Sequence, residues 1–205
     1  MVATKGDKTR TAIVREALKL AAGIGLESVS LGVLATKLDL SKSGLFAHFK
    51  SKEALQLAVL EEAVERFTQR VVLPALAQPR GEPRVKALFK NQLDWAENNG
   101  FGKGCFFVSL AQEYDDQPGP MRDRVVQQEA DWRTCISKAV TIAIQEGHFN
   151  ASVDPAQFAF EFLGLTHSFQ QATKLVHDPK ARTFAERAFE RILADARSKK
   201  RNQSN

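Results

Sequence analysis

Apolar residues recur every three or four positions along most of the chain, which is the spacing that places them on one face of an α-helix. Strict alternation of apolar and polar residues, the pattern of a half-buried strand, does not extend over any useful length. Serine or aspartate before a stripe and glycine or proline after it mark the helix ends. We therefore expect an all-α fold of about nine helices, at approximately 12–23, 31–38, 42–49, 52–73, 83–97, 105–113, 121–146, 155–177 and 180–197.

The second and third expected helices are short and lie close together. Ser30 is placed to cap the first of them and Ser41 the second, because a serine hydroxyl accepts a backbone N–H of the first helical turn. A longer helix precedes the pair and another follows it. Two short helices held in this way are typical of a helix-turn-helix, whose second helix enters the major groove of DNA.

The excess positive charge lies in the same segment. The formal net charge of the 205 residues is +5. Residues 1–52 hold nine Lys and Arg against four Asp and Glu, which accounts for the whole excess. A basic module of this kind favours a polyanionic partner, although a solvated basic surface is the alternative. Aromatic residues are distributed the other way, since only Phe46 and Phe49 of the 14 Phe lie in this segment.

Residues 9–60 resemble the DNA-binding domain of the TetR family of transcriptional regulators. The resemblance rests on the helix at 12–23, on Ser30-Leu31 and Leu34-Ala35 at the start of the next helix, and above all on the run LSKSGLFAHFKSKEAL at 40–55. It implies a three-helix DNA-binding domain, a long linking helix and a C-terminal helical domain for ligand binding and dimerisation. It also implies that the partners are double-stranded DNA, a second copy of the chain and a small-molecule effector of unknown identity.

The resemblance also implies which residues contact DNA. Lys42 and Ser43 would face base edges, Gly44 would let the backbone approach the sugar-phosphate chain, and Ala47 would touch a thymine methyl group. Phosphate contacts would come from Ser30, Phe46, His48 and Lys52, and an N-terminal arm would carry Lys8 and Arg10. Three positions depart from the family pattern. They are Phe46 in place of a tyrosine, Gly32 in place of a polar or basic residue, and Asp39 in place of a turn glycine.

We expect three parts in the chain: the DNA-binding domain at 1–52 (about 9–60 with the start of the linking helix), a ligand-binding and dimerisation domain at 53–197, and a basic polar tail at 198–205. The last two helices carry apolar residues on more than one side, which favours contact with a second chain as well as with the body. A deeply buried internal helix pair is the alternative. The candidate interface residues are Phe158, Phe162, Leu165, Phe169, Val176, Phe184, Phe189 and Ile192.

An effector pocket is expected among the aromatic residues of the body, which would favour an apolar or aromatic ligand, although such residues often only pack a core. The candidates are Phe67, Phe89, Trp95, Phe101, Cys105, Phe106, Phe107, Tyr114, Met121 and Trp132. Cys105 has a second interpretation. A thiol at a helix N-terminus near Lys103 can have a lowered pKa, which would suit a redox or electrophile sensor.

Other classes of protein fit the sequence less well. No nucleophile elbow, P-loop or metal-ligand spacing is present, so we expect neither an enzyme nor a cofactor or metal site. A helical ligand-binding or scaffold dimer without operator specificity is the remaining alternative. The polar N-terminus and the short apolar stretches predict a cytoplasmic protein with no membrane partner. Repression, with release of DNA on effector binding, is the expected mode of regulation.

Overall fold

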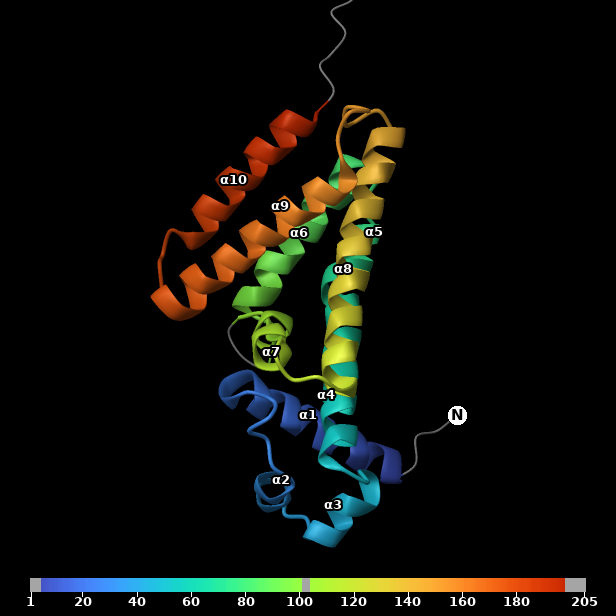
Figure 1. The fold of residues 1–205 in the computed structure, drawn as a ribbon, viewed down its shortest axis with the longest axis vertical. Coiled ribbons are helices and arrows are strands. Elements are labelled where there is room, and N and C mark those ends of the chain that lie inside the picture. The colour runs from blue at the N-terminus through green and yellow to red at the C-terminus, as the bar shows by residue number, and fades with distance from the viewer. Residues whose placement is uncertain (1–4, 101–103, 198–205) are drawn as a thin grey trace, which may run out of the picture. The chain divides into compact units, whose positions relative to one another are not determined.

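The computed structural model describes residues 5–100 and 104–197, apart from the side chains of Lys5 and Lys42. Every regular element in these ranges is a helix, and an isolated bridge pairs Phe149 with Arg197 (Figure 1). The predicted all-α fold is confirmed. Its α-helices are α1 (Lys5–Ile24), α2 (Leu31–Lys37), α3 (Lys42–His48), α4 (Lys52–Phe67), α5 (Leu73–Leu76), α6 (Glu82–Glu97), α7 (Phe106–Tyr114), α8 (Pro120–Gln145), α9 (Pro155–Gln170) and α10 (Ala181–Ala196).

Two π-helical segments interrupt what the sequence predicts as continuous helices. The first, η1 (Thr68–Val72), joins α4 to α5, and the second, η2 (Gln171–Val176), extends α9. Pro74 lies in the first turn of α5. Proline has no N–H to donate to the carbonyl four residues earlier and its ring crowds that carbonyl, so an α-helix cannot pass through it unchanged. The wider turn of η1 accommodates this change just before the proline.

The chain forms two compact units. Unit 1 contains residues 1–67 and 98–128, and unit 2 contains residues 68–97 and 129–205. Unit 1 therefore combines α1 to α4 with α7 and the first part of α8. Residues 98–128, which the sequence analysis assigns to the C-terminal domain, belong to the same unit as the predicted DNA-binding segment. Where the functional domains begin and end stays a prediction.

The core of unit 1 forms where α1 and α4 pack together and hold the two short helices. Ile13 and Leu18 of α1 are fully buried, as are Leu34 of α2 and Leu45 of α3. Phe49, which follows α3, is also buried. Each short helix thus keeps an apolar side in the shared core, and the opposite side of the helix faces solvent.

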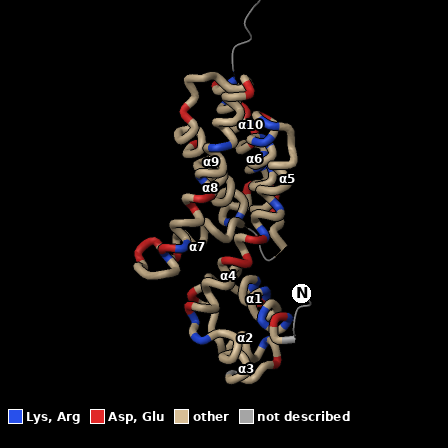
Figure 2. The backbone as a smooth tube through the Cα atoms, turned by 90° about the vertical axis from the view of Figure 1, so that its right-hand side faces the viewer, with Lys and Arg blue, Asp and Glu red and all other residues tan. Residues whose placement is uncertain are grey.

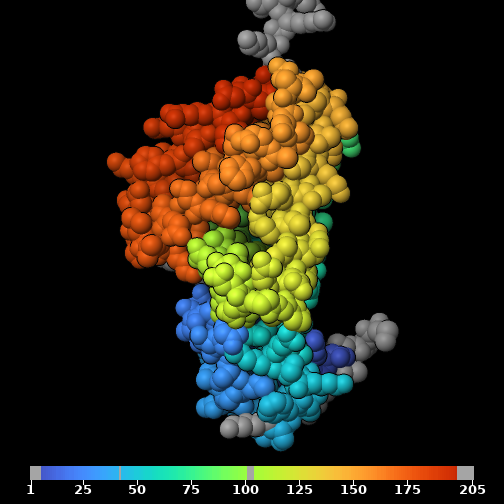
Figure 3. Space-filling view, viewed as in Figure 1, coloured from blue at the N-terminus to red at the C-terminus, as the bar shows by residue number. Residues whose placement is uncertain are grey.

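The core of unit 2 is a cluster of aromatic rings contributed by α6, α8, α9 and α10. Phe89 of α6 stacks on Phe189 of α10 with ring centroids 3.8 Å apart, and Phe162 of α9 meets both rings edge-on. Trp132 of α8 packs against Phe162 as well. Helices α9 and α10 pack against each other, and their orange and red surfaces lie side by side in Figure 3.

A second set of contacts closes unit 2 at the loops between α5 and α6 and between α8 and α9. Gly81 has a φ of 91°, and a Cβ there would lie 2.0 Å from His148 Nδ1. The same Nδ1 accepts the backbone N–H of Glu82, whose carboxylate pairs with Arg197. Only glycine fits this position, because a side chain would meet both backbone strain and the imidazole.

Candidate nucleic-acid interface

Helices α2 and α3 each begin at a serine cap. Ser30 Oγ accepts the N–H of Val33 at 3.1 Å, and Ser41 Oγ accepts the N–H of Gly44 at 3.0 Å. The caps predicted from the sequence are confirmed. Asp39, between the two helices, has a φ of 52°, the left-handed conformation that aspartate tolerates better than most residues. The turn therefore forms without the glycine of the family pattern.

The outward side of α3 carries small and apolar side chains. Ser43 and Ala47 are exposed, and the exposed fraction of Phe46 is 50%. His48 is half-buried, and the side chain of Lys42 lies outside the described residues. Exposed apolar groups on such a helix match thymine methyl groups, and the serine hydroxyl can donate to or accept from base edges. This surface is available for reading a major groove.

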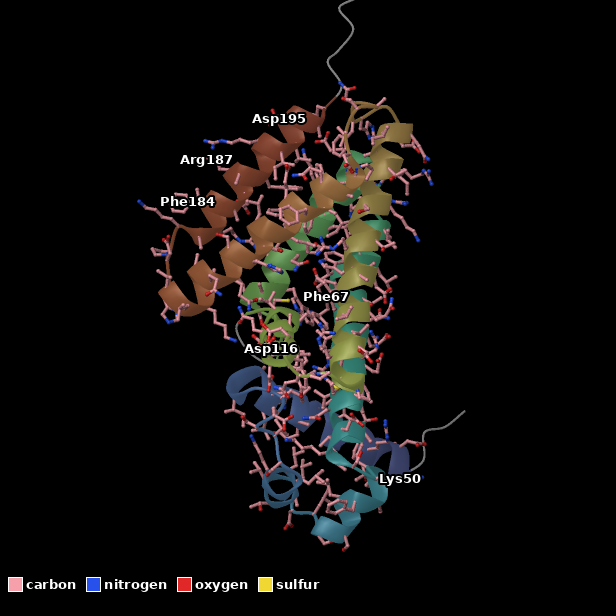
Figure 4. The ribbon with its side chains drawn as sticks, in the orientation of Figure 1. Lys50, Phe67, Asp116, Phe184, Arg187 and Asp195 are labelled. Atoms are coloured by element: carbon pink, nitrogen blue, oxygen red, sulfur yellow. The ribbon has the colours of Figure 1, made fainter. Side chains whose placement is uncertain are left out.

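The absence of a side chain at Gly44 leaves room for the Ser41 hydroxyl that caps α3. A Cβ at this position would lie 3.1 Å from Ser41 Oγ, the atom that caps α3. A larger residue would therefore crowd the capping hydroxyl of Ser41 and would also add side-chain bulk to the surface of the helix. Basic residues surround the capped helices on α1, on α2 and between α3 and α4 (Figure 2). Lys50, labelled in Figure 4, is one of these and is exposed.

The predicted N-terminal arm is wrong for Lys8 and Arg10, because both lie within α1, which begins at Lys5. Asp7 in the first turn favours this earlier start, since a negative charge is stabilised at a helix N-terminus. Thr11 Oγ1 also donates to the Asp7 carbonyl. Both basic side chains are exposed, and the Arg10 guanidinium lies 4.9 Å above the Phe49 ring. Their contact with DNA stays a prediction.

Lys52, at the start of α4, is already engaged inside unit 1. Its Nζ donates to the backbone carbonyl of Glu27 at 2.6 Å and to Glu27 Oε1 at 2.5 Å. Gln56 and Tyr114 both donate to the other oxygen of this carboxylate. The Lys52 ammonium and the Gln56 amide lower the pKa of the Glu27 carboxyl, whereas burial raises the pKa of the Tyr114 hydroxyl. Tyr114, predicted to line a pocket, thus contacts the turn after α1.

The carboxylate of the adjacent residue, Glu113, binds the backbone of the same turn. Its Oε2 accepts the N–H of Leu26 at 2.9 Å and its Oε1 accepts the N–H of Glu27 at 2.5 Å. Sequence reasoning missed Glu27, Gln56 and Glu113. No motif or short-range spacing could have revealed them, because each contact joins residues far apart in the chain.

The predicted effector residues fall into both units. Phe67, Cys105, Phe106, Tyr114 and Met121 are buried in unit 1, where the half-buried Phe107 meets Phe67 edge-on at 5.4 Å. The remaining described candidates, Phe89, Trp95 and Trp132, are buried in unit 2. Phe101 lies outside the described residues. A shared pocket stays a prediction.

The candidate interface residues divide by burial. Phe158, Phe162, Phe169 and Phe189 are core residues of unit 2, because the apolar seam that predicted a partner helix packs inside the unit. Leu165 and Ile192 are half-buried, and Val176 and Phe184 are exposed. Phe160 and Leu175 are exposed as well. An interface between copies is therefore expected on these outer side chains.

Neither Cys105 nor Cys135 forms a disulfide bond. Cys105 is buried, unlike the accessible thiols of redox sensors, and burial raises the pKa of the half-buried Cys135 thiol. Within the described ranges, no group of three or more His, Cys, Asp or Glu is placed to hold a metal ion. None of the helices in those ranges combines the length and apolarity required to span a membrane.

Two family models match the sequence. Residues 13–59 match bacterial regulatory proteins of the tetR family, and residues 81–189 match the tetracyclin repressor-like C-terminal domain. The second match alone covers more than half of the chain. No curated protein sequence matches at a significant level.

Solved structures match over nearly the whole chain. A TetR transcriptional regulator from Chloroflexus aurantiacus J-10-fl has a TM-score of 0.82 at 25% identity, over 93% of this chain and 94% of that one. AibR in complex with isovaleryl coenzyme A and operator DNA has a TM-score of 0.68 at 22% identity, over 90% and 96%. A protein from Saccharomonospora viridis in complex with choline has a TM-score of 0.75 at 17% identity, over 94% and 99%.

Replacing Ser41 with alanine tests whether the cap holds α3 in place. We expect Ser41→Ala to destabilise this helix by about 1 kcal/mol, because the Gly44 N–H loses its acceptor. Amide hydrogen exchange followed by NMR would then show faster exchange at Gly44. Ser28→Ala, at an exposed serine before α2, is the matched control and should leave the Gly44 amide unchanged. Unchanged protection of Gly44 in Ser41→Ala would contradict the role of the cap.

Proposed function

Because the chain belongs to the TetR family of bacterial regulatory proteins, we propose that it is a ligand-responsive repressor that binds palindromic DNA as a homodimer. The observation that carries the proposal is the pair of serine-capped short helices in unit 1, with the outer side of α3 open to solvent. In this proposal α3 enters the major groove and an effector bound in the helical body releases the DNA.

The proposed contacts divide into phosphate contacts and base contacts. At the N-terminus of α2, Ser30 and its neighbouring N–H groups suit a phosphate, since a helix N-terminus attracts negative charge. At α3, Lys42 and Ser43 would face base edges, and Phe46 and Ala47 offer apolar contacts for thymine methyl groups. Phe46 has no hydroxyl, so it would contribute shape and apolar contact without a hydrogen bond to phosphate.

Selection of a random duplex library on the purified protein tests operator binding. We expect the retained sequences to share a pseudo-palindrome whose half-sites lie about one helical turn apart, or a multiple of it, because two-fold symmetry in the protein is mirrored in the DNA. Sequencing at moderate salt provides the measurement. Retention without a shared sequence, lost as salt rises, would instead indicate nonspecific phosphate binding and would favour the scaffold alternative.

The proposed homodimer rests on an apolar surface of unit 2. Phe160, Leu175, Val176 and Phe184 have exposed fractions of 63%, 72%, 67% and 51%. Phe184 and Arg187 project from α10 on the side away from α9 (Figure 4). Large apolar side chains left exposed on α9, η2 and α10 favour a protein partner. A C2 pairing of these side chains would join two copies of the DNA-binding segment at residues 1–52, here called the head, and a palindrome requires two such copies.

Charge placed on this surface should separate the dimer. We expect Phe184→Glu to be monomeric at micromolar concentration, because the dimer would have to bury one glutamate from each protomer, and removing a charge from water is costly. Its operator affinity should fall by at least about a hundredfold, since the two half-sites would no longer be bound by one linked molecule. Analytical ultracentrifugation and operator binding measure the two effects.

Val126→Glu is the matched control, because Val126 is exposed to 52% on α8, in unit 1. This variant introduces the same charge but should remain dimeric. A Phe184→Glu protein that stays dimeric would place the interface elsewhere.

The core of unit 2 supports an uncharged effector. Among the described residues, none of its buried side chains is Asp, Glu, Lys or Arg. Gln92 of α6 is buried, and its Oε1 has no hydrogen-bond partner among those residues. An unpaired buried acceptor costs about 1–3 kcal/mol, which a ligand N–H or O–H would recover. We therefore propose an apolar or aromatic effector that carries one such donor.

A panel of uncharged phenols, aromatic amides and aliphatic alcohols tests this class. We expect the active compounds to release the protein from a labelled operator, measured by fluorescence anisotropy. Gln92→Leu should weaken their potency about tenfold, because the donor loses its acceptor. Gln145→Leu, at an exposed glutamine of α8, is the control. Compounds that raise the melting temperature at saturation but never change operator affinity would contradict the effector scheme.

A further inference from the structure

The Lys52 ammonium is bound at both a backbone and a side-chain acceptor of one residue. The carbonyl and the carboxylate of Glu27 accept it at 2.6 and 2.5 Å, so two of its three N–H groups are used. Both side chains are still partly open to solvent, with exposed fractions of 40% for Lys52 and 51% for Glu27. A DNA phosphate approaching Lys52 would therefore meet a carboxylate that already holds the same ammonium.

Residues of α4 and α7 hold Glu27 in this position. Gln56 Nε2 donates to Glu27 Oε2 at 2.8 Å, and the Tyr114 hydroxyl donates to it at 3.3 Å. Glu113 fixes the backbone of the same residue by accepting its N–H. Both acceptors of Lys52 are thus positioned by contacts that include the last two residues of α7.

Gly25 shows how closely α7 lies against the turn. A Cβ at Gly25 would lie 3.1 Å from Glu113 Oε1, and its φ of 84° is a conformation that side chains rarely adopt. The turn is thus shaped around the Glu113 carboxylate, which accepts two consecutive backbone N–H groups there. A shift of α7 would break contacts to the backbone and to the side chain of Glu27 together.

We propose that Glu27 restrains Lys52 from binding a DNA phosphate, and that Tyr114 and Glu113 of α7 set how firmly it does so. The inference rests on the proposed DNA-binding function. Glu27 opposes phosphate binding in two ways. It neutralises the ammonium, and its own negative charge lies beside the place that the phosphate would occupy. Glu27, Glu113 and Tyr114 are therefore positioning residues, whereas Lys52 is the group that contacts DNA.

The test measures how Glu27→Gln changes the affinity for a fluorescent mixed-sequence duplex of about 30 base pairs, roughly three helical turns. Glutamine keeps the shape of the side chain and removes its charge. We expect about two- to fivefold tighter binding, the range for an exposed ion pair. The salt dependence should steepen by about one ion per protomer, because each freed ammonium neutralises one more phosphate. A variant whose head is only loosened would bind more weakly with no steeper salt dependence.

Further variants assign the effect to the Glu27–Lys52 pair. Glu61→Gln is the control, since Glu61 is similarly exposed but pairs with Arg124 on α8. In a Lys52→Met background, Glu27→Gln should no longer steepen the salt dependence. Tyr114→Phe removes only the hydroxyl contact and should tighten binding by less than Glu27→Gln. It should have no effect once Glu27 is glutamine.

The outcomes distinguish this inference from the proposed function. If the wild-type protein does not bind the duplex in a salt-dependent way, both fail. If it binds but Glu27→Gln binds equally or more weakly, only the restraint is overturned. If Glu61→Gln tightens binding as much, the effect belongs to net charge and the restraint is again overturned. Thermal melting of each variant shows whether the head remains folded. If Glu27→Gln does not fold, the duplex affinity of Tyr114→Phe tests the restraint separately.

Discussion

The head depends on the anchoring of two helices that are too short to persist alone. Helices α2 and α3 contain seven residues each, well below the length at which an isolated helix is stable in water. Each therefore relies on a serine cap at its start and on an apolar side chain in the core between α1 and α4, Leu34 for α2 and Leu45 for α3. Because the same core fixes which side faces inward, it also fixes which side is exposed to solvent.

Local signals in the sequence predicted the parts of the structure that local chemistry determines. Ser30 and Ser41 are expected as caps and are caps, because a cap depends on residues two or three positions away. The start of α1 and the π-helical turn before Pro74 were missed. In both places the helix extends beyond the boundary expected from the sequence, because the sequence signal for a helix end is weak there. The Glu113 contacts could not be predicted at all, since they join residues 86 and 87 positions apart.

Helix α9 shows why an apolar stripe in the sequence does not identify the helix that covers it. Phe158, Phe162, Leu165 and Phe169 follow one another at spacings of four, three and four residues, which predicts a seam for another helix, and a seam is present. Its partners are in the same unit, where Phe89 and Phe189 meet Phe162. Periodicity reports that a face is buried but not whether the covering helix belongs to the same chain. Only the side chains left exposed in the fold indicate a second copy.

The acidic residues of the head are as informative as its basic ones. Glu16 pairs with Lys37 and Lys19, and Glu27 pairs with Lys52. These partners lower the pKa of both carboxyls, which therefore stay ionised at neutral pH. The positive field of the head still attracts DNA at long range, because the sum over residues 1–52 remains positive. At contact distance, however, a phosphate that approached one of these paired lysines would have to replace its carboxylate, exchanging one anion for another. Exchange of this kind gains little free energy, so a small movement of the competing carboxylate suffices to change it.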